Sequence, residues 1–465
     1  MAFDEDFHLG IIRLYASHIS PFWIHQPGGA NTYGAVARDP SYLYQYVMSF
    51  PYRLITLFTH KQSVIVIFLR IINIALFANG LYLFKRLLTR TGASLAKINF
   101  TLLVFILIPV VPLLAAQINY DNLFFLLTAA VLILTIDLAD YLFKKKVDVS
   151  LLVFVISLCL LASLVKYAFL PIAAIVGLYI IFEVLKNLGV KPFIKYLVQD
   201  WQRLTTLRKV VLVLPLIISI GLFYQRYGVN VIKYHTPIPD CSKVLTINQC
   251  KQYGPWIRDY NFKINRIDTE IGTEKNVLTF TADWFYGMWL RTFYSLSGPG
   301  DDYQSRGPLP IPSLSATFFA AIGIIAALAA YKKVLKNTNA HHVLFLTLVA
   351  VFYTIALYLD EYRAFADTGQ PVAINGRYIF PVILPVILIL VVGLAVLIRN
   401  SRLRTALAVL CIVGLCWGGG VLTFILRSND YWYWNSSIVR SANHGVQQII
   451  GPVTPGNGNP ALYLK

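Results

Sequence analysis

Long apolar runs separated by short polar segments recur along almost the whole chain. A helix needs about 20 residues to cross roughly 30 Å of hydrocarbon, and ten stretches approach this length. They cover residues 62–84, 98–116, 122–141, 149–165, 168–185, 210–225, 314–331, 343–359, 379–398 and 405–426. The pattern predicts an all-α fold, a polytopic transmembrane helical bundle of about ten spans.

Composition supports the same class. Of the 465 residues, 57% are hydrophobic and 13% are charged, whereas soluble domains carry about 25% charged residues. The chain is therefore expected to be a multi-pass membrane protein, located in the plasma membrane and in contact with membrane lipids.

The positive charge is concentrated in alternate loops. Nineteen of the 40 Lys and Arg residues lie in five of them: Lys85, Arg86, Arg90 and Lys97; Lys144 to Lys146; Lys186, Lys191, Lys195, Arg203, Arg208 and Lys209; Lys332, Lys333 and Lys336; and Arg399, Arg402 and Arg404. Basic residues in short loops are retained on the cytoplasmic side. The net charge of +18 is thus explained by topology, and no nucleic-acid partner is expected.

This orientation places both termini outside the cytoplasm. An external N-terminus needs an export signal, and residues 1–61 show neither a signal peptide nor a span. We therefore expect a further span upstream, which would make eleven. The predicted regions are an external loop with interfacial helices and an acidic motif (1–61), spans one to six (62–225), an external loop domain (226–313), spans seven to ten (314–426) and an external tail (427–465).

Two of the five cysteines lie in the long external segment. Cys241 and Cys250 are close enough in sequence for a disulfide in an oxidising compartment. No second pair of cysteines or histidines stands nearby at the spacing of a zinc site.

The chain begins with three consecutive carboxylates, Asp4, Glu5 and Asp6. Apolar residues from Phe7 onward recur at helical spacing, so the carboxylates begin a helix. They could simply cap it and complement its dipole. Three acids, with His8 one turn after Asp4, exceed what capping needs, and a chemical role is the competing interpretation.

The aromatic stretch at residues 21–55 is best interpreted as an ordinary belt of aromatic side chains at the membrane interface.

Further polar clusters lie on the same predicted face. Asn119 and Asp121 occupy a tight turn, which backbone preferences alone would explain. Lys166, Arg377 and Arg70 lie near the external ends of spans, against the positive-inside pattern. Each cation alone could extend its side chain to the interface. Together they are suited to holding a phosphate.

The ordered set of motifs resembles the GT-C superfamily of membrane-embedded glycosyltransferases. FDEDFHLG is similar to the first external loop of protein O-mannosyltransferases, which carry a Phe-Asp-Glu…His-Phe-Gly run. The chain resembles more closely a family of predicted bacterial membrane proteins of this superfamily. The shared pattern comprises Asp4, Glu5 and His8; Pro40 to Tyr46; Asn119 and Asp121; Lys166; and Gly376, Arg377, Tyr378 and Pro381.

The resemblance implies transfer of a sugar from a polyprenyl-phosphate carrier to a glycan, lipid or protein acceptor on the extracytoplasmic face. Asp4 would be the general base, and Glu5 would position the acceptor or a metal. Lys166, Arg377 and Arg70 would hold the phosphate, with His8, Asn119, Asp121 and Tyr378 completing the substrate site. A divalent metal ion is compatible with the carboxylates, although no spacing requires one.

Two other functions stay open. A transporter or flippase of lipid carriers would use similar cations, but should carry charged residues through the full membrane depth. A non-catalytic scaffold of cell-envelope assembly would need none of the clusters. The donor sugar and the acceptor cannot be read from the sequence.

Overall fold

The computed structural model describes residues 4–108, 110–268, 277–293, 311–372, 374–416 and 437–450. Within these ranges the regular structure is helical and contains no strand. Six helical segments are long and apolar enough to cross a membrane. They are α3 (Gln62–Arg90), α6 (Tyr120–Phe143), η2 with α8 (Tyr167–Asn187), α10 to α11 (Thr206–Tyr234), α18 (Ala340–Thr368) and η4 with α19 (Gly376–Leu397). The described part of the chain is thus a helical protein suited to a membrane.

Four predicted spans appear in shorter or altered form. α7 (Val149–Val165) is apolar but shorter than the six. α16 (Ile311–Ala329) and α20 (Ser401–Cys416) cover the described parts of two further predicted spans and adjoin residues outside the described ranges. The predicted span 98–116 is wrong as a single helix, because α4 (Leu95–Leu107) ends before α5 (Val110–Ala115) begins. Ile108 between them has an extended backbone, with ψ of 125°. Proline at position 109 explains this, since the residue before a proline disfavours the helical conformation. Residues 417–426 of the last predicted span lie outside the described residues.

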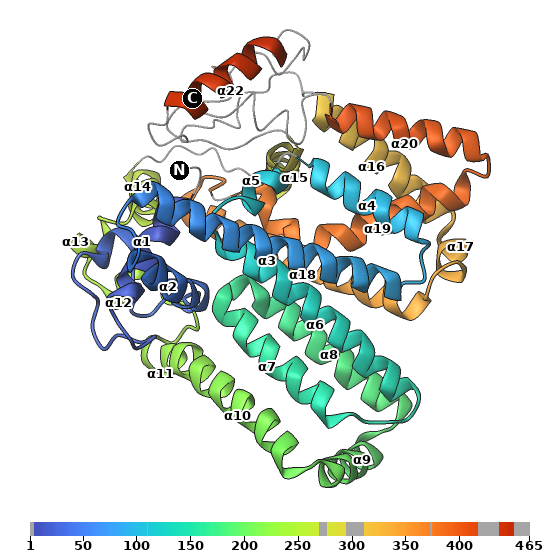
Figure 1. Cartoon of the computed structure of the whole chain (residues 1–465), viewed down its shortest axis with the longest axis horizontal. Helices are drawn as coiled ribbons and strands as arrows, with labels where there is room; N and C mark the ends of the chain where they lie inside the picture. Colours follow the sequence, from blue (N-terminus) through green and yellow to red (C-terminus); the bar gives the residue numbers. More distant parts are fainter. Residues whose placement is uncertain are drawn as a thin grey trace.

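α6 lies at the centre of one half of the bundle, in contact with α3, α7 and α8 (Figure 1). Its Phe125 ring stacks on Phe84 of α3, with 4.4 Å between ring centroids. A Cβ at Gly80 would lie 2.6 Å from the Phe125 ring. The close approach of α3 to α6 therefore depends on a glycine at this position.

Two side-chain contacts tie the C-terminal end of α6 to its neighbours. Arg90 Nη2 of α3 lies 2.6 Å from Asp137 Oδ1. His342 Nε2 of α18 lies 2.9 Å from Asp140 Oδ1. Between Asp121 and Asp137, α6 carries no charged residue.

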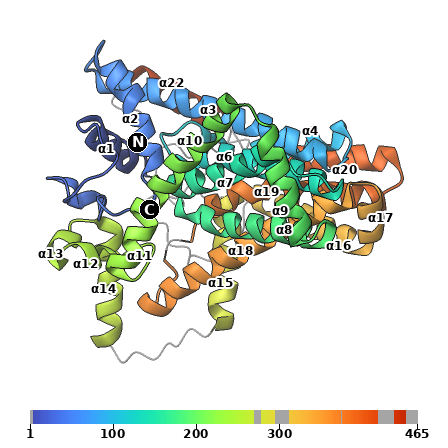
Figure 2. The ribbon, with the colours of Figure 1, turned by 90° about the horizontal axis from the view of Figure 1, so that it is seen from below.

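The N-terminal segments gather at the opposite end of the bundle (Figures 1 and 2). They comprise α1 (Glu5–Ala16), η1 (Ala30–Tyr33) and α2 (Leu43–Thr56), near α11 (Val229–Tyr234), α12 (Cys241–Val244), α13 (Ile247–Cys250) and α14 (Gly254–Asp268). Cys241 and Cys250 form a disulfide. Tyr253, three residues later, stacks on Phe7 of α1 with 6.1 Å between ring centroids.

A buried arginine fastens the first loop to the end of α10. Arg226, in the π-helical turn Tyr224–Gly228, is 0% exposed. Its guanidinium donates to the carbonyl oxygen of Ala37 and, at 3.0 Å, to that of Pro21. Tyr42 lies under the guanidinium, 4.5 Å from ring centroid to Cζ. The loop before α2 is thereby held in place as a packed structure.

The remaining described helices are α9 (Val190–Arg203), α15 (Val277–Phe293), α17 (Tyr331–Lys336) and α22 (Ser437–Ile450). α9 buries none of its residues and lies at the end of α10 farthest from α1 (Figure 1).

Candidate active site

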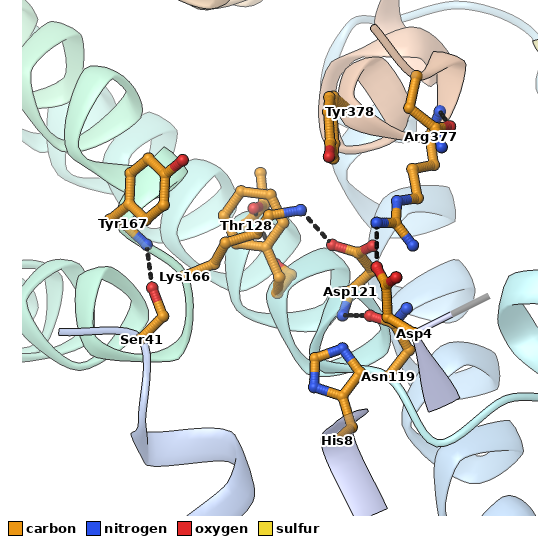
Figure 3. A network of polar contacts seen from close by, with 12 residues as sticks. Asp4, His8, Ser41, Asn119, Asp121, Thr128, Lys166, Tyr167, Arg377 and Tyr378 are labelled. Carbon is orange, nitrogen blue, oxygen red and sulfur yellow. Dashed lines mark hydrogen bonds and ion pairs between the residues drawn. The ribbon is translucent and has the colours of Figure 1, made fainter. Parts of the chain in front are cut away.

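Asp4 and Arg377 meet at the N-terminal end of α1 (Figure 3). Asp4 occupies the N-cap position, but its side chain makes no capping hydrogen bond. Instead, Arg377 Nη2 donates to Asp4 Oδ2 in a short ion pair. The carboxylate is therefore committed to a partner 373 positions away in sequence, and capping does not account for it.

The backbone around Arg377 is fixed by its neighbours. Asn375 caps the 3₁₀ turn η4 by accepting from the Arg377 backbone N–H at 3.1 Å. A Cβ at Gly376 would lie 2.1 Å from Thr292 Oγ1 and 2.4 Å from Thr292 N. Tyr353 donates its hydroxyl to the Tyr378 carbonyl oxygen at 2.8 Å. The Gly-Arg-Tyr motif is thus a close-packed turn that aims the guanidinium at α1.

A second ion pair lies beside the first. Lys166 Nζ, at the junction of α7 and α8, donates to Asp121 Oδ1 at 2.6 Å. The two side chains are 6% and 3% exposed. The ammonium also lies over the rings of Tyr120 and Tyr378, at 4.6 and 4.9 Å from their centroids. Cation–π contact and the carboxylate together compensate the loss of water around a buried lysine.

Asn119 has a structural position in this cluster. Its side-chain oxygen accepts from the Asp121 backbone N–H at 2.9 Å and caps α6. Its side-chain nitrogen is buried without a hydrogen-bond partner, and so is Asp121 Oδ2. Buried polar atoms are normally paired. Two unpaired ones beside two ion pairs indicate a position prepared for a polar ligand or water.

Glu5 and Arg70 are engaged with each other. Arg70 donates through Nε to Glu5 Oε1 at 2.8 Å and through Nη2 to Glu5 Oε2 at 2.5 Å. The Ile118 backbone N–H also donates to Glu5 Oε1, at 3.1 Å. Glu5 is 0% exposed. This pair holds α1 against α3 and the turn before α6, which argues for a supporting role rather than contact with substrate.

His8 is buried in a neutral form. With the Gln45 amide nitrogen donating to the carbonyl oxygens of Ser41 and Tyr42, the amide oxygen accepts from His8 Nδ1 at 3.2 Å. The imidazole packs edge-on against Tyr120, with 4.5 Å between ring centroids. Burial lowers the pKa of His8 to about 4, although Asp4 and Asp121 oppose the shift. His8 is therefore uncharged at neutral pH.

Electrostatics distinguishes the two carboxylate–cation pairs. Burial alone raises the pKa of Asp4, but Arg377, with a smaller contribution from Lys166, opposes this effect and the net pKa is lowered. Burial lowers the pKa of Lys166, and Asp121 opposes this. The Asp4 side chain is 48% exposed, in contrast to the enclosed Lys166 and Asp121. The Asp4–Arg377 pair is thus the one that a ligand from solvent can reach.

A metal ion finds little support in this arrangement. No group of three or more His, Cys, Asp or Glu side chains comes together in the described ranges. Asp4 and Asp121 each face a cation, Arg377 and Lys166 respectively. These residues do not fit a divalent metal held by protein ligands alone.

Sequence reasoning missed the residue that joins these elements. Asn73 Oδ1 accepts hydrogen bonds from the Tyr44 hydroxyl at 2.8 Å and from Asn122 Nδ2 at 3.2 Å. It also accepts from the Asn119 backbone N–H at 3.4 Å. Asn73 is 0% exposed. An amide near the middle of the apolar run 62–84 was the available signal, because a polar side chain in a span normally serves a buried contact.

Comparison with protein families, with characterised proteins and with solved structures finds no match to this chain. A functional proposal therefore depends on the chemistry of the cluster and on the motif resemblance.

Proposed function

We propose that this chain is a membrane glycosyltransferase that moves a sugar from a polyprenyl-phosphate donor to an acceptor hydroxyl on the extracytoplasmic face. The observation that carries the proposal is the Asp4–Arg377 ion pair, which stands beside the enclosed Lys166–Asp121 pair. The reaction needs a carboxylate to accept a proton and a cation to hold a departing phosphate. These two groups face each other here.

Charge balance suggests how the carboxylate is released. Asp4, Asp121, Lys166 and Arg377 sum to zero when all are ionised, and His8 is neutral. A donor phosphate that enters adds negative charge, and Arg377 binds phosphate in a bidentate manner. The phosphate therefore competes with Asp4 for the guanidinium. Once Asp4 loses this partner, its pKa rises, because the charge and hydrogen bond of Arg377 no longer lower it. Donor binding converts a weak base into a stronger one.

The chemical step follows from these positions. The acceptor oxygen forms a bond to the anomeric carbon as its proton passes to Asp4. The bond from the anomeric carbon to the phosphate oxygen breaks, and its electron pair leaves with the polyprenyl phosphate. Arg377 stabilises the negative charge on that leaving group. In this scheme Lys166 keeps Asp121 and Tyr378 in position and supplies positive potential.

The alternative of a lipid-carrier flippase receives less support. A polar head group that crosses the bilayer needs charged or polar partners along its path. α6 has no charged residue between Asp121 and Asp137, which corresponds to roughly 24 Å of helix. The ion pairs lie at the two ends of this helix.

The test is transfer of labelled sugar from a panel of polyprenyl-phosphate sugars by membranes that contain the full-length protein. Asp4→Asn should lower the rate by about a hundredfold to ten-thousandfold, because the amide cannot take the proton. Asp6→Asn is the matched control, since Asp6 is an exposed neighbour on the first turn of α1 and should retain full activity. Undiminished transfer by Asp4→Asn, or no transfer by the wild type from any donor, would contradict the proposal.

Arg377→Lys examines the phosphate role separately. Lysine keeps the charge but lacks the planar, bidentate fork. We expect a higher KM for the donor together with a lower kcat, because the guanidinium serves both binding and departure of the phosphate. A KM and a kcat that are both unchanged within twofold would contradict a role of Arg377 in holding the phosphate.

A further inference from the structure

A cavity opens just beyond the C-terminal end of α1. It has a volume of about 590 Å³ and is lined by His18, Ser20, Phe22, Trp23, Ile24, His25, Arg38 and Gln225. α1 has 12 residues, so its two ends are roughly 18 Å apart. None of the residues of the Asp4–Arg377 cluster lines the cavity, which is therefore a separate site.

The ionisable groups of the lining all carry or can acquire positive charge. Arg38, His18 and His25 contribute basic nitrogens, and no Asp or Glu is among the lining residues. A cavity of this composition attracts an anion and offers no ligand to a cation.

Arg38 has an unused donor inside the protein. Its Nη1 atom lies against the protein and has no hydrogen-bond partner, whereas the residue as a whole is partly exposed and lines the cavity. By contrast, Arg53, at the end of α2, donates to the carbonyl oxygens of Ala16, Tyr15 and His18. Leaving a charged donor unsatisfied is costly. Arg38 is thus built differently from the arginine that serves a structural role nearby.

Other donors converge on the same space. His18 Nδ1 lies 3.0 Å from the Ser20 carbonyl oxygen and donates to it, which leaves Nε2 for a ligand. The Ser20 hydroxyl oxygen accepts from the Phe22 backbone N–H at 3.1 Å, so its proton remains to be donated.

The rim of the cavity is apolar. Ile24 is 88% exposed, and Ile19, which adjoins the lining residues His18 and Ser20, is 84% exposed. Exposed isoleucines beside a cationic cavity match a ligand with a charged head and a hydrocarbon part. We propose that this cavity binds a phosphate group through Arg38 and the adjoining histidines, and that the phosphate is carried by the head group of an anionic lipid.

The site and the proposed transferase chemistry are independent. Lipid binding at Arg38 requires neither Asp4 nor Arg377, and the transfer reaction requires no residue of this cavity. Each proposal can therefore fail while the other stands.

The test uses the purified full chain and two probes. Native mass spectrometry measures binding of phosphatidylglycerol, with phosphatidylcholine for comparison, and calorimetry measures binding of inorganic phosphate. Arg38→Gln should weaken phosphatidylglycerol binding at least tenfold, since a charge-assisted hydrogen bond is lost. Arg13→Gln, which removes an exposed arginine of α1 outside the cavity, should leave binding unchanged.

The outcomes separate the sources of the phosphate. Loss of phosphatidylglycerol binding in Arg38→Gln, with no binding of inorganic phosphate by the wild type, supports a lipid site. Arg38-dependent binding of both probes supports recognition of phosphate whatever its carrier. His25→Gln, at an exposed position, repeats the test if Arg38→Gln does not fold, as judged by its thermal midpoint. Equal affinity in the wild type and the folded variants, or binding of neither probe, overturns the proposal.

Discussion

Glu5 of the first helical turn forms a two-pronged ion pair with Arg70 of α3, 65 positions away. The adjacent Asp4 reaches instead toward Arg377. Two neighbouring carboxylates thus connect α1 to two different helices. Their exposure differs as well, because the Glu5 side chain is 0% exposed and the Asp4 side chain is 48% exposed. Of the two carboxylates, only that of Asp4 is open to solvent.

Glu5→Gln should destabilise the protein without acting on the chemistry directly. The substitution leaves Arg70, whose side chain is 28% exposed, without its counter-charge. We expect a loss on the order of 2 kcal/mol in the free energy of unfolding, measured as a lower thermal midpoint in detergent. Adding Arg70→Gln should recover part of the loss, and Asp6→Asn should show none. A double variant no more stable than Glu5→Gln alone would contradict the ion-pair explanation.

Stability should also depend on pH through His8. Its folded pKa of about 4 lies below the unfolded value of about 6.5. Between these values the unfolded chain binds the proton more readily, so stability is complete above about pH 6.5 and falls as the pH drops toward 4. The full effect is of the order of 3 kcal/mol.

The measurement is the unfolding free energy at several pH values for the wild type and for His8→Gln. The variant should lose most of the pH slope in this window. His25→Gln, at an exposed position between α1 and η1, is the control and should keep the wild-type slope. An unchanged slope in His8→Gln would show that other groups cause it.

Gly376→Ala should displace Arg377. The new methyl group meets the backbone nitrogen of Thr292 as well as its hydroxyl, so shortening the Thr292 side chain cannot relieve the contact. Overpacking of this kind costs about 1–3 kcal/mol. We expect the rate of sugar transfer by the folded variant to fall, while the thermal midpoint drops only by the few degrees that this loss of stability implies. Gly177→Ala, on α8 with no atom near the added carbon, is the matched control.

Topology can be tested by impermeant thiol labelling of intact cells. In a protein whose other cysteines are replaced, Cys241 and Cys250 should react after mild reduction, because basic loops define the opposite side as cytoplasmic. A cysteine introduced by Arg402→Cys should react only after permeabilisation. The reverse pattern of labelling would show that the chain has the opposite orientation in the membrane.

The sequence predicted the helical class well and the partners within the site less well. Apolar runs identify helices because their signal is local, and α3, α6 and α19 lie where hydropathy predicts them. The interruption after Leu107 also has a local cause, the proline at position 109, but the length of the apolar run concealed it.

The pairing of charges has no local signal. Arg70, which the resemblance assigns to the phosphate, contacts Glu5, and no local pattern in the sequence predicted that contact. The motifs did predict that Asp4, Asp121, Lys166 and Arg377 would share one region, and Figure 3 shows them there. Which carboxylate takes which cation depends on helix packing, which a linear pattern does not contain.

α6 is anchored at both ends. Asp121 is tied to Lys166 at one end, and Asp137 and Asp140 are tied to Arg90 and His342 at the other. Sliding this helix along its axis by one turn, about 5.4 Å, would break all three contacts together. These contacts therefore oppose a piston-like movement of α6 along its own axis. Relative movement of the neighbouring helices would have to occur around α6 and not by displacement of α6 itself.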